Sequence, residues 1–160
     1  MEDKLHNNIL YGRPFGGTAV LVHKELSGRS YRITTDNPRI TSVCIKNHRN
    51  AAIIVSSLYM PWSDRSLEQV FEYEAAVGCM QSIIDRNVGC NFIFGGDLNV
   101  SKLASSTCAQ SVHDFCLANK IQWLETGNST SHYTYHSDVN NHYSLLDFFL
   151  CSPQFIKNSQ

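Results

Sequence analysis

The run "AAIIVSSLY" at residues 51–59 restricts the possible folds more than any other part of the chain. A short, nearly continuous apolar segment rich in β-branched residues is typical of a strand buried on both faces. The segments "GTAVLVH" at 17–23 and "RITSVCIK" at 39–46 have similar strand character. We expect these three segments to be adjacent strands of one sheet.

A helix and a further strand follow this run. Asp64 or Ser66 can cap a helix, with Gln69 three residues after Ser66, and apolar residues recur at helical spacing through residues 66–86. A short apolar strand at 91–94 comes next, so the order is strand, helix, strand. We therefore predict that 51–59 and 91–94 are neighbouring central strands, with the helix packed across them.

The C-terminal half predicts a second helix at 107–119 and a final apolar strand at 145–150. The length of 160 residues and the 42% hydrophobic content suit one domain over 1–160 with a sizeable core. The apolar runs are too short to cross a bilayer, so we expect no membrane partner. The polar N-terminus "MEDKLHNNIL" does not read as a secretory signal, which favours an intracellular location, nuclear or cytoplasmic.

The net charge and the cysteine spacing give little support to a nucleic-acid footprint, a zinc site or a redox motif. The six cysteines form no CxxC pair, so a zinc or redox motif is not predicted, and we expect reduced thiols. The net charge of −1 gives no overall basic footprint for nucleic acid. Arg13 and Lys24 belong to a locally basic N-terminal region, where they either touch phosphates or are ordinary solvated charges.

The stretch "NFIFGGDLNV" at 91–100 ends a strand on two glycines, followed by Asp97 and Asn99. One interpretation is a plain turn, because Gly, Asp and Asn are common turn residues. The other is that the glycines let a ligand approach the backbone closely. Ligands in open α/β sheets gather at the carboxyl ends of strands, where Asp97 and Asn99 are expected.

Two more side chains stand out at strand ends. Asp147 interrupts the apolar "LLDFFL", where a buried acid needs a partner. It either lies at a strand end facing solvent or orients a partner, usually a histidine. Tyr59 ends the run 51–59 and is either a core tyrosine or a phenol that reaches a substrate.

The late histidines His132, His136 and His142 allow a metal site, but they lie in a polar stretch without a helical pattern. Scattered loop histidines are the simpler interpretation.

Four motifs in order resemble the endonuclease/exonuclease/phosphatase superfamily, the fold of AP endonucleases and DNase I. They are "GRPFGGTAVLV" (12–22), "LYMPW" (58–62), "GGDLN" (95–99) and "SLLDFF" (144–149). The first looks most like the endonuclease domain of non-LTR retrotransposon polyproteins, which is associated with a reverse transcriptase. The fold that this resemblance implies is an α/β, two-sheet sandwich with outer helices, present here in part.

The resemblance also implies roles for four residues. Asp97 would position or deprotonate the attacking water, and Asn99 would contact the phosphate. Tyr59 would be the phosphate-side tyrosine, and Asp147 would brace a catalytic histidine. The implied cofactor is Mg²⁺, the implied partner is DNA, and the implied activity is that of a Mg²⁺-dependent phosphodiester hydrolase that nicks DNA.

The chain departs from the family pattern at both ends. The motif with the principal glutamate ligand of the metal and the motif with the catalytic histidine are not found, so the metal ligands are not assigned. We therefore expect a truncated domain that is inactive alone. A phosphatase or RNA nuclease on the same fold, and a non-catalytic remnant or binding module, remain alternatives.

Overall fold

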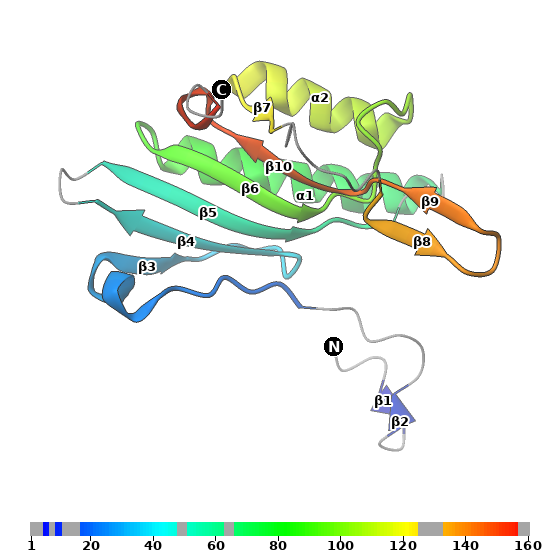
Figure 1. Cartoon of the computed structure of the whole chain (residues 1–160), viewed down its shortest axis with the longest axis horizontal. Coiled ribbons are helices and arrows are strands. Elements are labelled where there is room, and N and C mark those ends of the chain that lie inside the picture. Colours follow the sequence, from blue (N-terminus) through cyan, green and yellow to red (C-terminus); the bar gives the residue numbers. More distant parts are fainter. Residues whose placement is uncertain are drawn as a thin grey trace.

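A six-stranded mixed sheet forms the centre of the molecule (Figure 1). The computed structural model describes residues 5–6, 9–10, 17–47, 51–62, 66–124 and 133–156. The order of strands across the sheet is β3-β4-β5-β6-β10-β7. Their bounds are β3 Ser30–Ile33, β4 Ile40–Lys46, β5 Ala52–Tyr59, β6 Asn91–Asp97, β7 Gln122–Trp123 and β10 Asp147–Cys151.

The predicted strand-helix-strand unit is confirmed. Strands β5 and β6 pair in parallel, and α1 (Leu67–Arg86) connects them. The Ser66 side chain caps α1 by accepting a hydrogen bond of 3.3 Å from the Gln69 backbone N–H. The second helix, α2, spans Thr107–Asn119, as predicted.

Both helices cover the same face of the sheet and lie behind it in Figure 1. Alternate residues of β5 and β6 are buried on this face, because successive side chains of a strand point to opposite sides. The innermost of these are Ile54, Leu58 and Phe94. Tyr73, Met80 and Ile83 of α1 complete this core together with the buried residues of α2.

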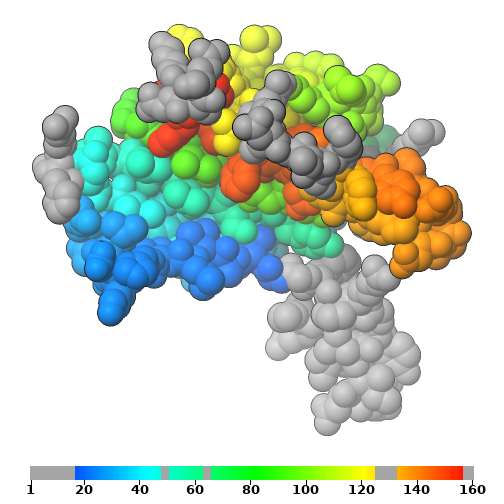
Figure 2. Space-filling view, viewed as in Figure 1, coloured from blue at the N-terminus to red at the C-terminus, as the bar shows by residue number. Residues whose placement is uncertain are grey.

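The opposite face of the sheet carries no α-helix among the described residues, and it is the face seen in Figure 2. We call it the open face. Its β5 residues Val55, Ser57 and Tyr59 are only partly buried, and the Phe149 side chain of β10 is 51% exposed. The fold is therefore a mixed α/β architecture with one helix-covered face and one accessible face.

The prediction of a strand at 17–23 is wrong. These residues form no ladder, and β3 takes the edge of β4 where they were expected to pair. The segment is tied to the open face by side-chain bonds instead. The Thr18 and Thr41 hydroxyls lie 2.8 Å apart, and the Thr41 hydroxyl donates to the Thr18 carbonyl at 3.0 Å. β4 already has a neighbour on each edge, which leaves no place for a further strand there.

Two short hairpins accompany the central sheet. The first is β1 (Leu5–His6) with β2 (Ile9–Leu10), and the second is β8 (Tyr135–Ser137) with β9 (His142–Ser144). The second projects beyond the end of the central sheet in Figure 1. No described helix combines the length and apolar character that a membrane span needs.

Candidate active site

Tyr59, Asp97 and Asp147 form a row across three neighbouring strands. Tyr59 is the register partner of Asp97 in the parallel pair β5–β6, and Asp147 is its partner in the antiparallel pair β10–β6. Partners in register place their side chains on the same face of a sheet. The three residues share the open face, because Ile54, Ser56 and Leu58, which alternate with Tyr59 along β5, are buried on the other.

Asp97 and Asp147 are a closely spaced pair. The neighbouring Leu98 N–H donates to the Leu146 carbonyl at 2.8 Å, which makes Leu98 and Leu146 the hydrogen-bonded pair of that antiparallel ladder. The pair beside it is then a non-hydrogen-bonded one, in which Cα atoms are about 4.5 Å apart and side chains are closer. The Asp97 and Asp147 side chains therefore project from directly opposite positions on the open face.

The environment of Asp97 favours its neutral form. Burial raises the pKa of this carboxyl, and the nearby Asp147 raises it further, while the hydrogen bond from the Asn99 backbone N–H lowers the pKa. Burial is the largest of the three causes, because desolvation penalises the charged form. A cation placed between the two carboxyl groups would offset this penalty.

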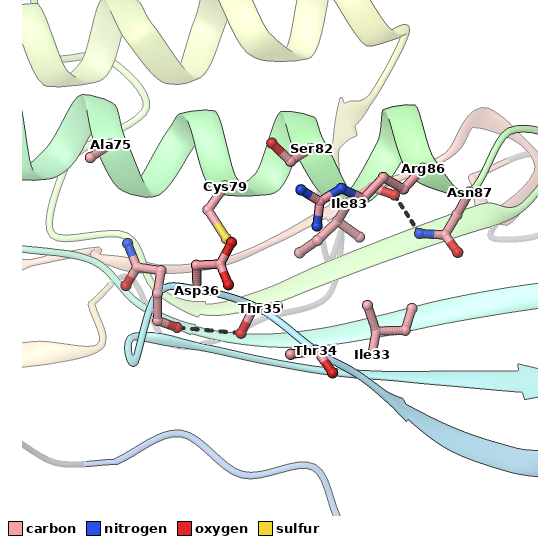
Figure 3. Close-up of a pocket in the computed structure, with 11 residues that line it drawn as sticks. Ile33, Thr34, Thr35, Asp36, Ala75, Cys79, Ser82, Ile83, Arg86 and Asn87 are labelled. Atoms are coloured by element: carbon pink, nitrogen blue, oxygen red, sulfur yellow. Dashed lines mark hydrogen bonds between the residues drawn. The ribbon is translucent and has the colours of Figure 1, made fainter.

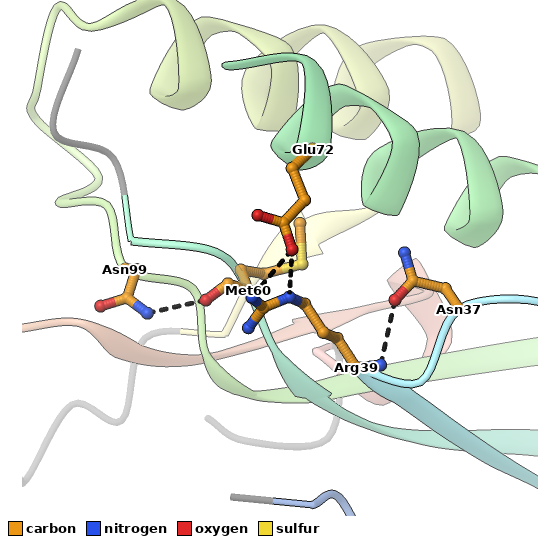
Figure 4. Close-up of polar contacts among 5 residues, drawn as sticks. All are labelled: Asn37, Arg39, Met60, Glu72 and Asn99. Carbon is orange, nitrogen blue, oxygen red and sulfur yellow. Dashed lines mark hydrogen bonds and ion pairs between the residues drawn. The ribbon is translucent and has the colours of Figure 1, made fainter. Parts of the chain in front are cut away.

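Asn99 belongs to a turn that follows β6. Its backbone φ is 50°, a left-handed conformation that Asn tolerates better than most residues. Its backbone N–H donates to Asp97 Oδ1 at 2.8 Å, and its side-chain Nδ2 donates to the Met60 carbonyl at 2.8 Å (Figure 4). Asn99 therefore lies in a turn, as the first of the two interpretations of this stretch predicted. Figure 4 also shows the Asn99 side-chain oxygen directed away from Met60.

The ligand-access interpretation of Gly95 and Gly96 is wrong, since protein atoms fill the space beside both. A Cβ at Gly95 would lie 2.5 Å from the Phe149 ring. A Cβ at Gly96 would lie 2.1 Å from the Leu58 carbonyl oxygen, and the φ of 141° at Gly96 disfavours side chains in any case. The strand also continues through both glycines to Asp97. They allow close packing between β5, β6 and β10.

Asp147 is the first residue of β10 and is exposed. Its position agrees with the interpretation in which Asp147 lies at a strand end and faces solvent. No described histidine contacts it. Its backbone N–H donates to the Thr134 hydroxyl at 3.1 Å, and the preceding Leu146 N–H donates to the same hydroxyl at 3.0 Å. Thr134 therefore fixes the start of β10 beside Asp97.

Arg39 is a residue near this row that the sequence did not reveal. Its guanidinium carbon lies 5.8 Å from the centre of the Tyr59 ring. Its Nε and Nη2 donate to Glu72 Oε1 of α1 at 3.0 and 2.8 Å (Figure 4). The three residues come together only through the pairing of β4 with β5 and the packing of α1, so no local sequence pattern signals them.

The other predicted candidates lie elsewhere. Arg13 and His132 are outside the described residues, and Lys24 is exposed in the 3₁₀ helix Lys24–Arg29. His136 and His142 are exposed on the β8–β9 hairpin. His136 Nδ1 lies 3.3 Å from Asp138 Oδ1, and its Nε2 lies 3.1 Å from Asn141 Oδ1. In the described part of the chain, no group of three His, Cys, Asp or Glu side chains is placed to hold a metal ion.

A pocket of about 320 Å³ lies between α1 and the segment that follows β3 (Figure 3). Its polar groups include Asp36, Cys79 and Arg86. None of the four predicted site residues lines it. The candidate site is therefore the part of the open face at the ends of β5 and β6, which we call the open edge, and not this pocket.

The residues at this edge fit a hard divalent cation in part. Asp97 and Asp147 offer carboxylate oxygens from neighbouring positions, and Asn99 adds a side-chain oxygen. Mg²⁺ prefers such oxygen ligands and commonly keeps several waters while binding one or two carboxylates. Asp97 and Asp147 are thus the two described acidic residues that would hold such an ion at this edge.

Comparison with known proteins shows which solved structures share this architecture. No protein-family model and no curated protein sequence matches the chain. Among solved structures it is similar to the endonuclease domain of TRAS1, a telomere-specific non-LTR retrotransposon, with 15% identity and a TM-score of 0.57 over 88% of this chain. It is also similar to an endonuclease/exonuclease/phosphatase from Bacteroides vulgatus, with 12% identity and a TM-score of 0.51 over 80% of the chain.

A third similar structure is a β-hairpin deletion mutant of beta toxin from Staphylococcus aureus, with 13% identity and a TM-score of 0.51 over 71% of the chain. The chain spans 58%, 56% and 43% of these three structures, in the order given. The chain has the endonuclease/exonuclease/phosphatase fold, also called DNase I-like. Within this fold, a non-LTR retrotransposon endonuclease domain is among its structural neighbours.

Proposed function

We propose that the open edge takes part in Mg²⁺-dependent hydrolysis of a phosphodiester, in the manner of a retrotransposon-type endonuclease that nicks DNA. The observation that carries this proposal is the row formed by Tyr59, Asp97 and Asp147 on one accessible face. Residues far apart in sequence are brought together there, as groups that act on one phosphate and its attacking water need to be. The fold supports this class of chemistry, since its neighbours include a nuclease domain.

Each residue of the row has a role that its environment suits. The Asp97 carboxylate lies beside Tyr59 on the open face, where it would position or deprotonate an attacking water. The Tyr59 hydroxyl can donate a hydrogen bond to a non-bridging phosphate oxygen, where charge builds up in the transition state, and so can the Asn99 Nδ2 hydrogen that is not donated to the Met60 carbonyl. Mg²⁺, when bound by Asp97 and Asp147, would neutralise part of that charge.

The proposal includes an expectation for the isolated chain. Two carboxylates bind Mg²⁺ weakly, and no described histidine stands at the row. Acid–base and charge-stabilising groups each contribute about 10²–10⁴-fold to a rate. We therefore expect no detectable nicking by residues 1–160 alone. A longer protein that contains these residues and supplies the family's glutamate and histidine should nick DNA.

The test is the conversion of supercoiled plasmid to the nicked form with Mg²⁺, using residues 1–160 and such a longer protein side by side. Asp97→Ala and Asn99→Ala in the longer protein should abolish nicking, and EDTA should do the same. Asp114→Ala, an exposed position on α2, is the matched control and should leave it unchanged. Nicking that persists in Asp97→Ala would refute the mechanism.

A non-catalytic binding module predicts a different result from the same experiment. The longer protein would then bind DNA without cutting it, at every Mg²⁺ concentration. Cleavage of RNA or release of phosphate from a small monoester, in place of DNA nicking, would identify one of the other activities considered for this fold.

A further inference from the structure

Arg39 is placed to hold the Tyr59 ring, and this contact reaches from the helix layer to the open face. The Arg39 guanidinium lies against the ring at 5.8 Å from its centre, within the range of a cation–π contact. Glu72 of α1 holds the guanidinium through two hydrogen bonds to one carboxylate oxygen, at 3.0 and 2.8 Å. Only 16% of the Arg39 side chain is exposed.

The backbone of Arg39 is fixed as well. Its N–H donates to the Asn37 side-chain oxygen at 3.0 Å, and its carbonyl accepts a hydrogen bond of 3.0 Å from the Tyr59 backbone N–H. Arg39 and Tyr59 are therefore joined twice, once through the backbone and once through the side chains. Figure 4 shows the Arg39 side chain directed toward Glu72, with the Asn37 side chain beside the Arg39 backbone.

The Tyr59 ring has no other polar support among the described residues. Its hydroxyl has no hydrogen-bond partner there, and its side chain is only partly buried at the end of β5. A ring held at one side by strand neighbours alone can rotate, and a misplaced catalytic group loses much of its effect. The Arg39 guanidinium is a described charged group that lies against this ring.

We infer that Arg39 is a positioning residue for Tyr59, held in place by Glu72, and that it sets the direction in which the Tyr59 hydroxyl meets a phosphodiester. The effect of Arg39 on phosphodiester binding rests on the proposed function. The contact between Arg39 and Tyr59 does not. Arg39 does not itself touch the substrate in this scheme. Its effect on binding passes through Tyr59.

The geometry is tested by NMR of the Tyr59 ring in residues 1–160, with the ring signal assigned from its loss in Tyr59→Phe. Arg39→Gln and Glu72→Gln should both move this signal, because each removes part of the support. Arg39→Lys keeps the charge without the planar fork, so it should give an intermediate position. Arg32→Gln changes an exposed arginine of β3 and should leave the signal in place.

The role of Arg39 in DNA binding is tested by fluorescence anisotropy, which measures the affinity for a short DNA duplex with Ca²⁺ in place of Mg²⁺. Arg39→Gln and Tyr59→Phe should each weaken binding by about two- to fivefold, the size of one such contact. The double variant should be no weaker than the weaker single one, since Arg39 acts through the Tyr59 hydroxyl. Thermal melting of each variant shows whether the fold is retained.

Three outcomes separate the inference from the proposed function. A Tyr59 signal that does not move in Arg39→Gln overturns the positioning role, whatever the DNA result. Additive losses in the double variant also overturn it, because Arg39 would then contact DNA directly. If the wild-type chain binds no DNA while the Tyr59 signal moves as expected, the positioning stands and the proposed function loses support.

Discussion

Asp97 and Asp147 lie directly opposite each other on neighbouring antiparallel strands, in the closely spaced type of cross-strand pair. Like charges at such positions are unfavourable, by up to about 1 kcal/mol. A chain that keeps two acids there, on an accessible face and beside Tyr59, retains a local cost to stability. The cost is understandable if the pair binds a cation, because functional sites are commonly less stable than the rest of a fold.

Replacing Asp97 with Asn should stabilise residues 1–160 at neutral pH, and in the longer protein it should abolish hydrolysis. The pKa of Asp97 is raised in the folded state, so the folded protein binds this proton more tightly than the unfolded chain. The stability from protonation is complete below the ordinary pKa of 3.8 and is lost as the pH rises through the raised value. The expected gain at pH 7 is up to about 1 kcal/mol, or about 2–4 °C in melting temperature.

Thermal melting at pH 7 and at pH 3 measures this effect. The gain from Asp97→Asn should be present at pH 7 and absent at pH 3, where the wild-type carboxyl is neutral in both states. Asn keeps the side-chain oxygen that accepts the bond from the Asn99 N–H. Asp114→Asn on α2 is the control and should change neither value. An Asp97→Asn variant that is less stable at pH 7 contradicts the assigned environment.

Gly95 and Gly96 should differ strongly in their tolerance of alanine. At Gly96 the new Cβ meets the backbone carbonyl of Leu58 at a positive φ, so nothing nearby can move aside cheaply. We expect Gly96→Ala to cost at least about 2 kcal/mol. At Gly95 the Cβ meets the half-exposed Phe149 ring, which can swing into solvent, so Gly95→Ala should cost only about 1 kcal/mol.

Urea unfolding of the two variants decides this comparison. Adding Phe149→Ala should recover stability in the Gly95→Ala background and should not do so for Gly96→Ala. Equal losses from the two alanine substitutions would contradict the close approach of β5 to Gly96.

The buried pair Ser42 and Ser56 should respond to substitution as a unit. Their hydroxyls lie 2.7 Å apart between β4 and β5, with 0% and 2% of each residue exposed. Ser42→Ala or Ser56→Ala leaves one buried hydroxyl without its partner, at a cost of about 1–3 kcal/mol. The double alanine variant should be less destabilised than the sum of the two single variants, and a double-mutant cycle by chemical denaturation measures the difference. Simple additivity would show that the hydroxyls do not depend on each other.

The strand-helix-strand unit was predictable from the sequence because its signals are local. The continuous apolar run in β5, the cap at Ser66 and the helical spacing of α1 each determine their own segment. The row of Tyr59 and Asp97 followed from the same unit, since parallel strands joined by one helix end at one edge. The place of Asp147 required its resemblance to a family motif.

The parts that failed depend on contacts between distant segments. The apolar character of 17–23 predicts a strand, but β3 occupies the edge of β4 that this strand would need. The glycine pair suggests an open turn, but Phe149 and Leu58 fill the space that the missing side chains leave. The contact of Arg39 with Glu72 joins residues 33 positions apart and has no sequence signature.

The place where a divalent cation binds decides whether the open edge is the active site. Mn²⁺ is a paramagnetic substitute for Mg²⁺ that broadens the NMR signals of nearby backbone N–H groups. On titration into isotopically labelled residues 1–160, signals at Asp97, Asn99 and Asp147 should broaden first, and Asp97→Asn should greatly reduce this effect. Broadening that starts elsewhere in the chain, or that is unchanged in Asp97→Asn, would contradict a cation site on the open edge.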